Sequence, residues 1–299
     1  MGLINANWKL MSSLWGQLLF IFPTIMRFVP GPHRRIYTNY LRLAQFVDEQ
    51  VERHRETLDP QNPRDFIDCF LLKMEQEKGN PDTHFTEDTL SKTTVNLFFA
   101  GTETVSSTLK YGLRLLLRYP EVEERLHEEI ERVLGGQRGP CLQDRARMPY
   151  ADAVVHEIQR FADIVPMGVP HRTTRDVRLR GYRVPEGTDV LPLLCTSQFD
   201  AEHFPSPETF DPRHFLDVSG RFRRSDAFMA FSAGKRVCLG EALAAAELFL
   251  FLTSILQCFQ LRGEAPPAAI DVTPESSGLG NVPRPYRLAL LPRGGPPHG

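Results

Sequence analysis

The residue best suited to chemistry in this sequence is Cys238, in the segment FSAGKRVCLG at residues 231–240. We expect the last long helix to begin one residue later, so that free backbone N–H groups and the positive helix end favour the thiolate. Gly234 and Gly240 suit a tight loop whose backbone approaches a flat ligand closely, and Arg236 can donate to an anionic group of that ligand. The alternative is a buried free cysteine that only packs at a helix start.

A second segment, FFAGTET at residues 98–104, places Gly101, Glu103 and Thr104 within an otherwise apolar stretch. A glycine costs up to about 1 kcal/mol inside a helix, and threonine side chains bond back to the carbonyl four residues earlier. The residues alone predict a kinked helix in which Thr104 is satisfied by Ala100.

Two other polar features are ambiguous when taken alone. Glu157 and Arg160 lie on one face of an expected helix, where such a pair is usually solvated and contributes little. His171, in Pro170-His171-Arg172, is by itself typical of a structural histidine. Only the surroundings of these residues can decide whether they belong to a site.

The elements that position these residues are expected to be mainly α-helical, with a small, segregated β component. Seven prolines lie in residues 1–139 and 17 in residues 140–299, so the first part can be nearly all helix while the second must be broken up. An apolar patch at residues 14–29 precedes an amphipathic helix at about 33–57, with Phe46, Val47 and Val51 on its apolar face, and a short helix at about 65–78.

Thr86 is expected to cap a long helix that runs uninterrupted to Pro120. Its centre, residues 95–100, is apolar nearly all round, which predicts a helix that passes through the core. The next helix should run from Pro120 to a stop at Gly135 and carry the pairs Glu121/Arg125 and Glu128/Arg132.

The second half of the chain changes character. Helices are predicted at residues 149–161 and 239–259, and short strands in hairpins at 165–195, with Gly181 at a turn. Residues 199–232 are irregular, strand-like pieces lie near 285–291, and a Pro/Gly tail covers residues 292–299.

Composition excludes several classes of function. The 35 basic and 37 acidic residues give a net charge of −2, which provides no electrostatic footprint for nucleic acid. The five cysteines form no C-x-x-C pair and are odd in number, which disfavours a disulfide framework or a zinc cluster. No membrane span is expected, because the most apolar stretches are interrupted by Pro23 or Glu247.

The pattern F-x-x-G-x-R-x-C-x-G at residues 231–240 resembles the haem-binding loop of cytochromes P450. A chance match of its five fixed residues in such a chain has odds on the order of 10⁻⁴. The motifs at 100–104, 157–160, 212–215 and 231–240 also follow the P450 order and spacing, and segments such as MPYADAVVHEIQRFADI look like vertebrate microsomal family 2, close to its lung and nasal xenobiotic-metabolising subfamilies.

This resemblance implies the C-terminal part of the P450 fold as a single partial domain. Its parts would be an F–G region (1–58), a long core helix (86–119), an E-x-x-R helix (149–161), β hairpins (165–195), a meander and cysteine loop (199–240) and a final helix (239–259). The chain looks N-terminally truncated, because nearly two hundred residues of a full-length relative, including the membrane anchor, would precede Met1.

The resemblance also implies a cofactor and the residues that hold it. The cofactor would be haem b with Cys238 as the thiolate ligand of iron, which favours O–O cleavage. Arg236 and His171 would contact the propionates, and Phe231 would shield the sulfur. Gly234, Gly240, Ala100 and Gly101 would also border the cofactor. Glu103 and Thr104 would hold water in an opened turn of the long helix and relay protons to bound dioxygen.

The remaining family roles concern support and substrate. Glu157, Arg160 and His214 would form a buried triad that locks the cysteine loop, with His214 in place of the family's usual arginine. By position in the family's recognition segments, the substrate pocket would include Asn96, Phe99, Ala100, Val165, Val169 and Leu279, each of which could equally be plain core.

The implied activity is the monooxygenation of small hydrophobic xenobiotics with O₂ and NADPH-derived electrons. NADPH–cytochrome P450 reductase would be the partner, with cytochrome b5 as an optional second donor, at a face carrying Arg221, Arg223, Arg224 and Lys235. Phe20, Phe22 and Phe28, beside Arg27, Arg34 and Arg35, suit the cytosolic surface of the endoplasmic reticulum membrane, and the alternative for this patch is burial against a missing domain. The alternative is a catalytically inactive helical module that binds partners or lipid surfaces.

Overall fold

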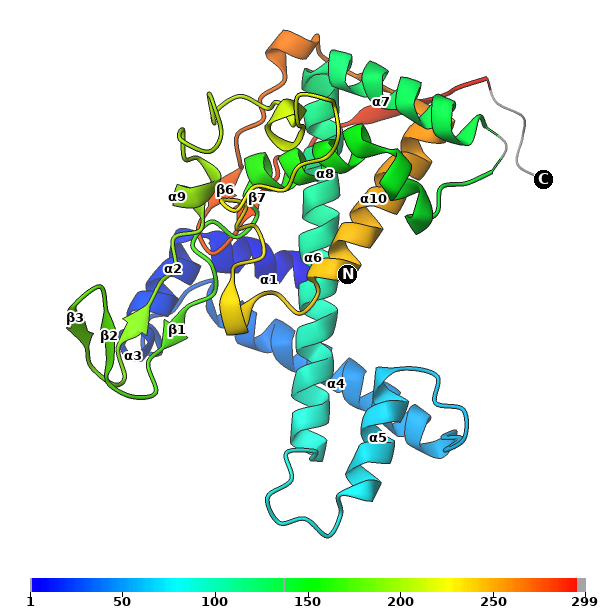
Figure 1. Cartoon of the computed structure of the whole chain (residues 1–299). Helices are drawn as coiled ribbons and strands as arrows, with labels where there is room; N and C mark the ends of the chain where they lie inside the picture. Colours follow the sequence, from blue (N-terminus) through cyan, green and yellow to red (C-terminus); the bar gives the residue numbers. More distant parts are fainter. Residues whose placement is uncertain (1, 137, 295–299) are drawn as a thin grey trace. The chain divides into compact units, whose positions relative to one another are not determined.

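The computed structural model describes residues 2–136 and 138–294 (Figure 1). Two compact units, Met1–Glu103 and Thr104–Gly299, divide the chain, and the long helix α6 (Glu87–Arg118) contributes to both. Part of the expected Pro/Gly tail, residues 295–299, lies outside the described residues. As predicted, the fold is mainly α-helical, with only short strands.

Five helices precede α6 in the first unit: α1 (Gly2–Ser12), α2 (Leu14–Ile21), α3 (Pro23–Met26), α4 (Arg34–Glu56) and α5 (Phe66–Gln76). The core of this unit forms where α4, α5 and the start of α6 bury apolar side chains against one another, among them Val47, Val51, Phe70, Leu90 and Val95. Phe46, expected on the buried face of α4, is exposed instead. It directly precedes Val47, so it points away from the face that packs on α5.

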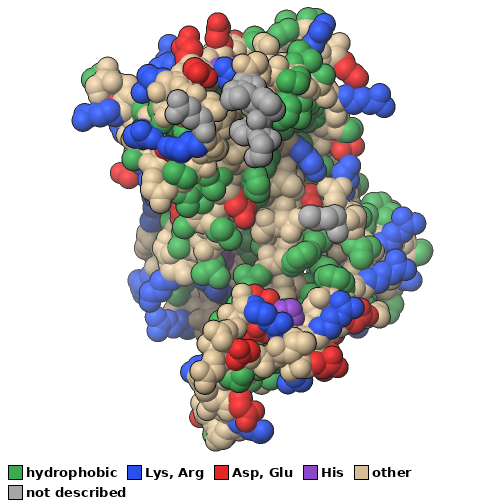
Figure 2. Space-filling model, turned by 90° about the vertical axis from the view of Figure 1, so that its right-hand side faces the viewer, with side chains coloured by type: hydrophobic (Ala, Val, Ile, Leu, Met, Phe, Trp, Pro, Cys, Tyr) green, Lys and Arg blue, Asp and Glu red, His purple; other side chains and the backbone are tan. Residues whose placement is uncertain are grey.

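The apolar patch at residues 14–29 folds into α2 and α3 and stays largely exposed. Phe28 keeps 81% of its surface exposed, and the same region exposes Leu14, Phe20, Ile21, Phe22 and Ile25. On the different face that Figure 2 presents, hydrophobic side chains also lie at the surface among charged ones. The described residues of this unit therefore leave the patch uncovered.

Helix α6 has nearly the predicted bounds, and Thr86 caps it by accepting a hydrogen bond from the backbone N–H of Thr89 at 3.2 Å. The prediction that residues 95–100 run through a core is wrong for most of that stretch. Val95 is buried, but Leu97 and Phe98 are exposed, because the described neighbours of this stretch within its own unit cover only one side of the helix. The fully buried leucines of α6 lie on either side of this stretch, Leu90 before it and Leu115 and Leu116 after it.

In the second unit, the long helices α7 (Pro120–Leu134), α8 (Pro149–Ala162) and α10 (Glu241–Cys258) pack on one another and on the end of α6 (Figure 1). Gly135 ends α7 in the left-handed region at φ +56°, as predicted. The predicted pairs along α7 are not the ones that form. Arg132 pairs with Glu129 at 3.2 Å, and the Arg125 guanidinium lies 4.1 Å from the Tyr150 ring centre.

The start of α8 is completed by a side chain of α7. No side chain of its own segment caps α8 at Met148. The buried Glu129 carboxylate accepts the backbone N–H groups of Tyr150 at 3.2 Å and Ala151 at 2.8 Å. An acidic group from a neighbouring helix thereby takes the place of an N-cap residue.

The strands form two-stranded antiparallel pairs. Strands β2 (Val177–Leu179) and β3 (Tyr182–Val184) make the predicted hairpin around Gly181, and β1 (His171–Arg172) pairs with β4 (Asp189–Val190). Further along, β5 (Phe259–Gly263) pairs with β8 (Leu288–Pro292), and β6 (Ser276–Ser277) with β7 (Asn281–Val282). The rest is loops with short turns: η1 (Leu142–Arg147), α9 (Cys195–Gln198), η2 (Pro212–Phe215), η3 (Gly234–Arg236) and η4 (Pro267–Ala269).

Helix α10 corrects two expectations. It begins at Glu241 rather than at residue 239, with Gly240 as its N-cap. Among the described helices, it is also long and apolar enough to cross a membrane by length and composition, in spite of Glu247. In this structure it buries Leu248, Phe249 and Leu252 in the core of its unit.

Candidate functional site

Cys238 lies in a tight reversal between η3 and α10. Its backbone N–H donates to the carbonyl of Phe231 at 2.9 Å, and Val237 N–H donates to Gly234 O at 3.1 Å. Ser232 and Gly234 are both left-handed, at φ +64° and +71°, which turns the chain back on itself within a few residues. Cys238 is therefore three residues before the first residue of α10, and not one as expected.

The cysteine forms no disulfide and is exposed, and its apolar neighbours are exposed too. Leu239 keeps 91% of its surface exposed, and Val237 and Leu243 are also exposed. A Cβ added to Gly234 would meet nothing within 4 Å. Because Cys238 is exposed, the alternative of a buried cysteine that only packs is wrong. Its soft sulfur lies among exposed apolar side chains. This donor set fits a large apolar group with a thiolate-bound metal, such as haem.

Glu157, Arg160 and His214 come together in the interior of the second unit. The Arg160 Nε and Nη2 atoms donate to the two carboxylate oxygens of Glu157 at 2.8 and 2.7 Å, and both side chains are 0% exposed. His214 Nδ1 lies 3.2 Å from each of the same oxygens. The pair is therefore buried, and the alternative of a solvated surface pair is excluded.

The Arg160 guanidinium is fully used. Besides Glu157, it donates to three backbone carbonyls of the following loops: Gln198 at 2.9 Å, Pro207 at 2.8 Å and Thr209 at 3.2 Å. A buried charge is tolerated when it is paired and fully hydrogen-bonded in this way. One arginine on α8 thus holds several turns of the meander.

His214 bonds on both sides of its ring. Nδ1 contacts Glu157, and Nε2 lies 2.7 Å from the carbonyl oxygen of Pro205. Burial lowers the pKa of His214, but the hydrogen bond and the charge of Glu157 outweigh it and raise the pKa above its ordinary value. Because both partners are acceptors, the doubly protonated, charged imidazolium suits this position.

The predicted oxygen-groove residues lie on α6, which is α-helical throughout, so the opened turn expected at Glu103 and Thr104 is not present. Glu103, in the first unit, is 4% exposed and accepts a hydrogen bond from Asn5 Nδ2 of α1 at 2.9 Å. Thr104 begins the second unit, and its carbonyl accepts the Thr108 hydroxyl at 2.8 Å. Ala100 and Gly101 are exposed, and a Cβ added to Gly101 would meet nothing within 4 Å.

The other predicted site residues are spread over both units. In the first unit, Asn96 is exposed and Phe99 is half-buried, with its ring 6.4 Å from that of Trp8. In the second, His171 starts β1 opposite Val190, and Val169 is exposed. Val165 and Leu279 are half-buried. The segments of Val165 and Leu279 are tied together, because Asn281 N–H donates to Ile164 O at 3.0 Å.

Two of the four basic residues expected at a docking face are already neutralised. Arg221 pairs with Asp217 at 3.1 Å and Arg224 with Glu241 at 2.8 Å. Arg223 and Lys235 are exposed. The positive character of this face therefore rests mainly on the latter two side chains.

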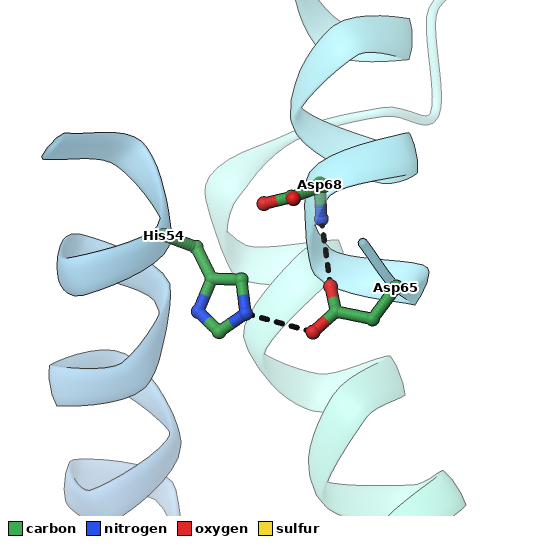
Figure 3. Close-up of side chains that lie close together, drawn as sticks. All are labelled: His54, Asp65 and Asp68. Carbon is green, nitrogen blue, oxygen red and sulfur yellow. Dashed lines mark hydrogen bonds and ion pairs between the residues drawn. The ribbon is translucent and has the colours of Figure 1, made fainter. Parts of the chain in front are cut away.

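One cluster was missed by sequence reasoning. The Nε2 atom of His54, on α4, lies 2.7 Å from Oδ2 of Asp65, the N-cap of α5 (Figure 3). The possible ligand atoms of His54, Asp65 and Asp68 lie within 4.8 Å of one another. Although these types can bind metals, Arg64 already donates to both Asp68 oxygens, at 2.6 and 2.9 Å. This pairing holds the pKa of Asp68 down at about 2. No spacing motif links α4 to α5, so the sequence carried no signal for it.

Comparison with known proteins finds similarity over nearly the whole chain. The family model for cytochrome P450 matches residues 1–290. The chain is 57% identical to cytochrome P450 2F3 of Capra hircus, 55% to cytochrome P450 2F1 of Homo sapiens and 53% to cytochrome P450 2G1 of Oryctolagus cuniculus. Each match covers 97% of this chain and 59% of the relative, so the chain spans about three fifths of the length of these relatives.

Proposed function

Because the chain belongs to the cytochrome P450 family, we propose that it functions as a haem-thiolate monooxygenase that oxidises small hydrophobic organic substrates and xenobiotics. The observation that carries this proposal is the exposed Cys238, in a reversal held by the Phe231–Cys238 hydrogen bond and surrounded by uncovered apolar side chains. A structural cysteine would have no reason to stand among exposed leucines in this way.

Cys238 would supply the thiolate ligand of haem b. When bound, the haem iron would activate O₂, and thiolate ligation favours O–O cleavage. Arg236 and His171 would each donate hydrogen bonds to a propionate, and Phe231 would shield the sulfur. Gly234 and Gly240 would border the flat ring, and Gly234 would allow the left-handed backbone of the loop.

Glu103 and Thr104 would handle protons. Glu103 is buried and accepts a hydrogen bond from Asn5, so its carboxylate has a fixed orientation. Such a buried acid can exchange protons with water held near the Thr104 hydroxyl. Both residues lie on a continuous helix, so this proposal needs no break in α6.

Substrate contacts would come from the family's recognition segments: Asn96, Phe99, Ala100, Val165, Val169 and Leu279. Electrons would come from NADPH through cytochrome P450 reductase, with cytochrome b5 as an optional second donor. Arg223 and Lys235 are the best candidates for that docking face, because Arg221 and Arg224 have acidic partners. Association with the endoplasmic reticulum membrane would use the exposed aromatic side chains of α2 and α3.

The decisive experiment is spectroscopic. The purified chain is mixed with haem, reduced and exposed to carbon monoxide. A strongly red-shifted Soret band supports thiolate ligation, and a chain that gives no Soret band contradicts the proposal. In Cys238→Ser the shifted band should disappear, whereas in Cys258→Ser it should remain, because Cys258 lies at the far end of α10.

The proton role has its own test. Thr104→Ala should consume NADPH without forming product in proportion, while the Soret band stays in place. Thr108→Ala is the matched control, because it removes a hydroxyl one helical turn away that bonds to Thr104 O. Unchanged coupling in Thr104→Ala would refute the relay.

A second function is favoured by one specific observation, the exposed apolar surface of α2 and α3. It is a catalytically inactive helical module that binds lipid surfaces or partners without haem. Co-sedimentation with lipid vesicles by a chain that gives no Soret band would support it. Loss of vesicle binding in Phe28→Ser together with intact haem binding would separate the two activities.

A further inference from the structure

The short helix α9 (Cys195–Gln198) lies between the Glu157–Arg160 pair and the cysteine loop in the contact network of the second unit. On one side, the Gln198 carbonyl accepts a hydrogen bond from Arg160 Nη1 at 2.9 Å. The adjacent Phe199 ring lies under the same guanidinium, 5.5 Å from its carbon. The end of α9 is therefore fixed directly by the buried ion pair on α8.

On its other side, α9 holds the chain that leads to Cys238. Gln198 Oε1 accepts the backbone N–H of Met229 at 3.2 Å, and the Ser197 hydroxyl donates to Ala227 O at 2.7 Å. Met229 O in turn accepts Ser232 N–H at 2.9 Å, which is where the reversal toward Cys238 begins. A continuous path of hydrogen bonds thus runs from Arg160 through Gln198 to the loop.

The burial of Gln198 makes this path informative. The residue is 0% exposed, and its Nε2 group finds no hydrogen-bond partner among the residues that the structure describes. An unsatisfied buried amide is costly, and an apolar side chain of similar shape would avoid that cost. The Met229 backbone N–H can only donate, so it requires the amide oxygen here. That contact is what an apolar replacement would lose.

We propose that Gln198 is a positioning residue, which passes the fixed position of the Glu157–Arg160 pair to the Cys238 loop. Its backbone carbonyl receives the arginine, and its side-chain oxygen holds the loop at Met229. The effect of Gln198 on haem binding rests on the proposed function. The contacts by which Gln198 joins Arg160 to Met229 do not depend on it.

The first test uses the full 299-residue chain without haem and measures amide hydrogen exchange. Gln198→Met keeps the length of the side chain and removes the acceptor. The Met229 amide should then exchange about fivefold faster or more, as expected for a lost hydrogen bond. The thermal midpoint should change little, because the lost Met229 contact and the removal of the unsatisfied Nε2 group have opposite effects on stability.

Two variants control for unspecific effects. Thr196→Ala removes a hydroxyl of the same helix that bonds locally to Leu193 O, and it should leave Met229 exchange unchanged. Gln198→Glu keeps an acceptor oxygen, so exchange at Met229, relative to amides in α7, should stay near that of the unsubstituted chain. If Gln198→Met leaves Met229 exchange unchanged, or accelerates all amides equally, Gln198 is not a positioning residue.

The second test adds haem. In Gln198→Met, a smaller share of the reduced carbon monoxide complex should show the red-shifted Soret band, and Gln198→Glu should restore that share relative to Gln198→Met. If Gln198→Met shows the same share of the red-shifted band as the unsubstituted chain, Gln198 does not position Cys238 for haem binding. If the unsubstituted chain itself gives no shifted band, the proposed function fails, and the exchange experiment still decides on the link.

Discussion

The molecule contains the same three residue types, a carboxylate, an arginine and a histidine, clustered in two different environments. In the second unit, Glu157 and Arg160 are 0% exposed and His214 is buried with them. In the first unit, Arg64 bonds to Asp68 in a similar bidentate way, and the Asp68 side chain is also 0% exposed, but that of Arg64 is 46% exposed. Solvent reaches the Arg64 guanidinium and does not reach that of Arg160, so the two clusters should respond differently to the same substitutions.

The largest effect is expected for Glu157→Gln. This substitution leaves the buried Arg160 charge without its counter-ion and should lower the free energy of unfolding by about 3–5 kcal/mol. Hydrogen exchange of α8 amides under increasing urea measures it. Asp68→Asn, followed in α5, is the matched substitution in the first unit and should cost clearly less, because the Arg64 guanidinium that loses its partner is 46% exposed and can be solvated. Equal losses at the two sites would remove the basis of the comparison.

Asp163 extends the comparison to a buried carboxylate that lies just beyond α8. Burial raises its pKa to about 7, although Arg160 lowers it somewhat. Since this value lies above the unfolded value, ionisation costs stability as the pH rises from about 4 to 7. Asp163→Asn should therefore raise the free energy of unfolding by about 1–3 kcal/mol at pH 8 and by much less at pH 4.

The asparagine also suits the left-handed backbone at this position, where φ is +41°. Urea unfolding at the two pH values is the measurement. A gain that is the same at both would mean that ionisation of Asp163 is not its source.

The two histidines provide a pH-dependent version of the comparison. Partners raise the pKa of both His214 and His54 above the ordinary value, against the opposing effect of burial. The stability that each contributes is complete below pH 6.5 and is lost as the pH rises through the raised pKa. We expect the larger loss from the buried His214.

The variant His214→Arg carries a permanent charge and should flatten this alkaline decline, whereas His54→Arg should change it less. Thermal unfolding between pH 6 and 9 tests both variants. A decline that persists unchanged in His214→Arg contradicts the assignment of the titrating group.

The smallest effect is expected at Arg64. Arg64→Gln removes an exposed partner of Asp68, and water can replace much of what is lost, so the thermal midpoint should shift less than in Glu157→Gln. Added Zn²⁺ should not raise the midpoint of the unsubstituted chain, because Arg64 occupies the Asp68 oxygens. A clear zinc-dependent rise would show that His54, Asp65 and Asp68 bind the ion in preference to the arginine.

Sequence reasoning worked where signals are local. The proline at Pro120 and the left-handed Gly135 define α7, and Thr86 caps α6, because each acts on its own backbone. The family spacing likewise identified Glu157, Arg160 and His214, although burial of the pair could not be read from the residues alone.

Reasoning failed where a side chain serves a distant segment. Nothing in the sequence distinguishes Glu129 from the other acidic residues of α7, yet its carboxylate accepts the backbone N–H groups of Tyr150 and Ala151. Gln198 bonds to a backbone amide, and such a contact leaves no pattern in the sequence. Helix α10 begins two residues later than predicted, because the Cys238 N–H donates to the Phe231 carbonyl within the loop and the chain turns once more before the helix.

The Glu129 carboxylate of α7 caps the start of α8, so the stability of α8 depends on the presence of α7. A peptide of residues 149–162 in isolation would begin with bare amide donors and would be too short to hold helical shape in water. A designed scaffold that includes the Glu157–Arg160 pair of α8 must therefore include α7 as well.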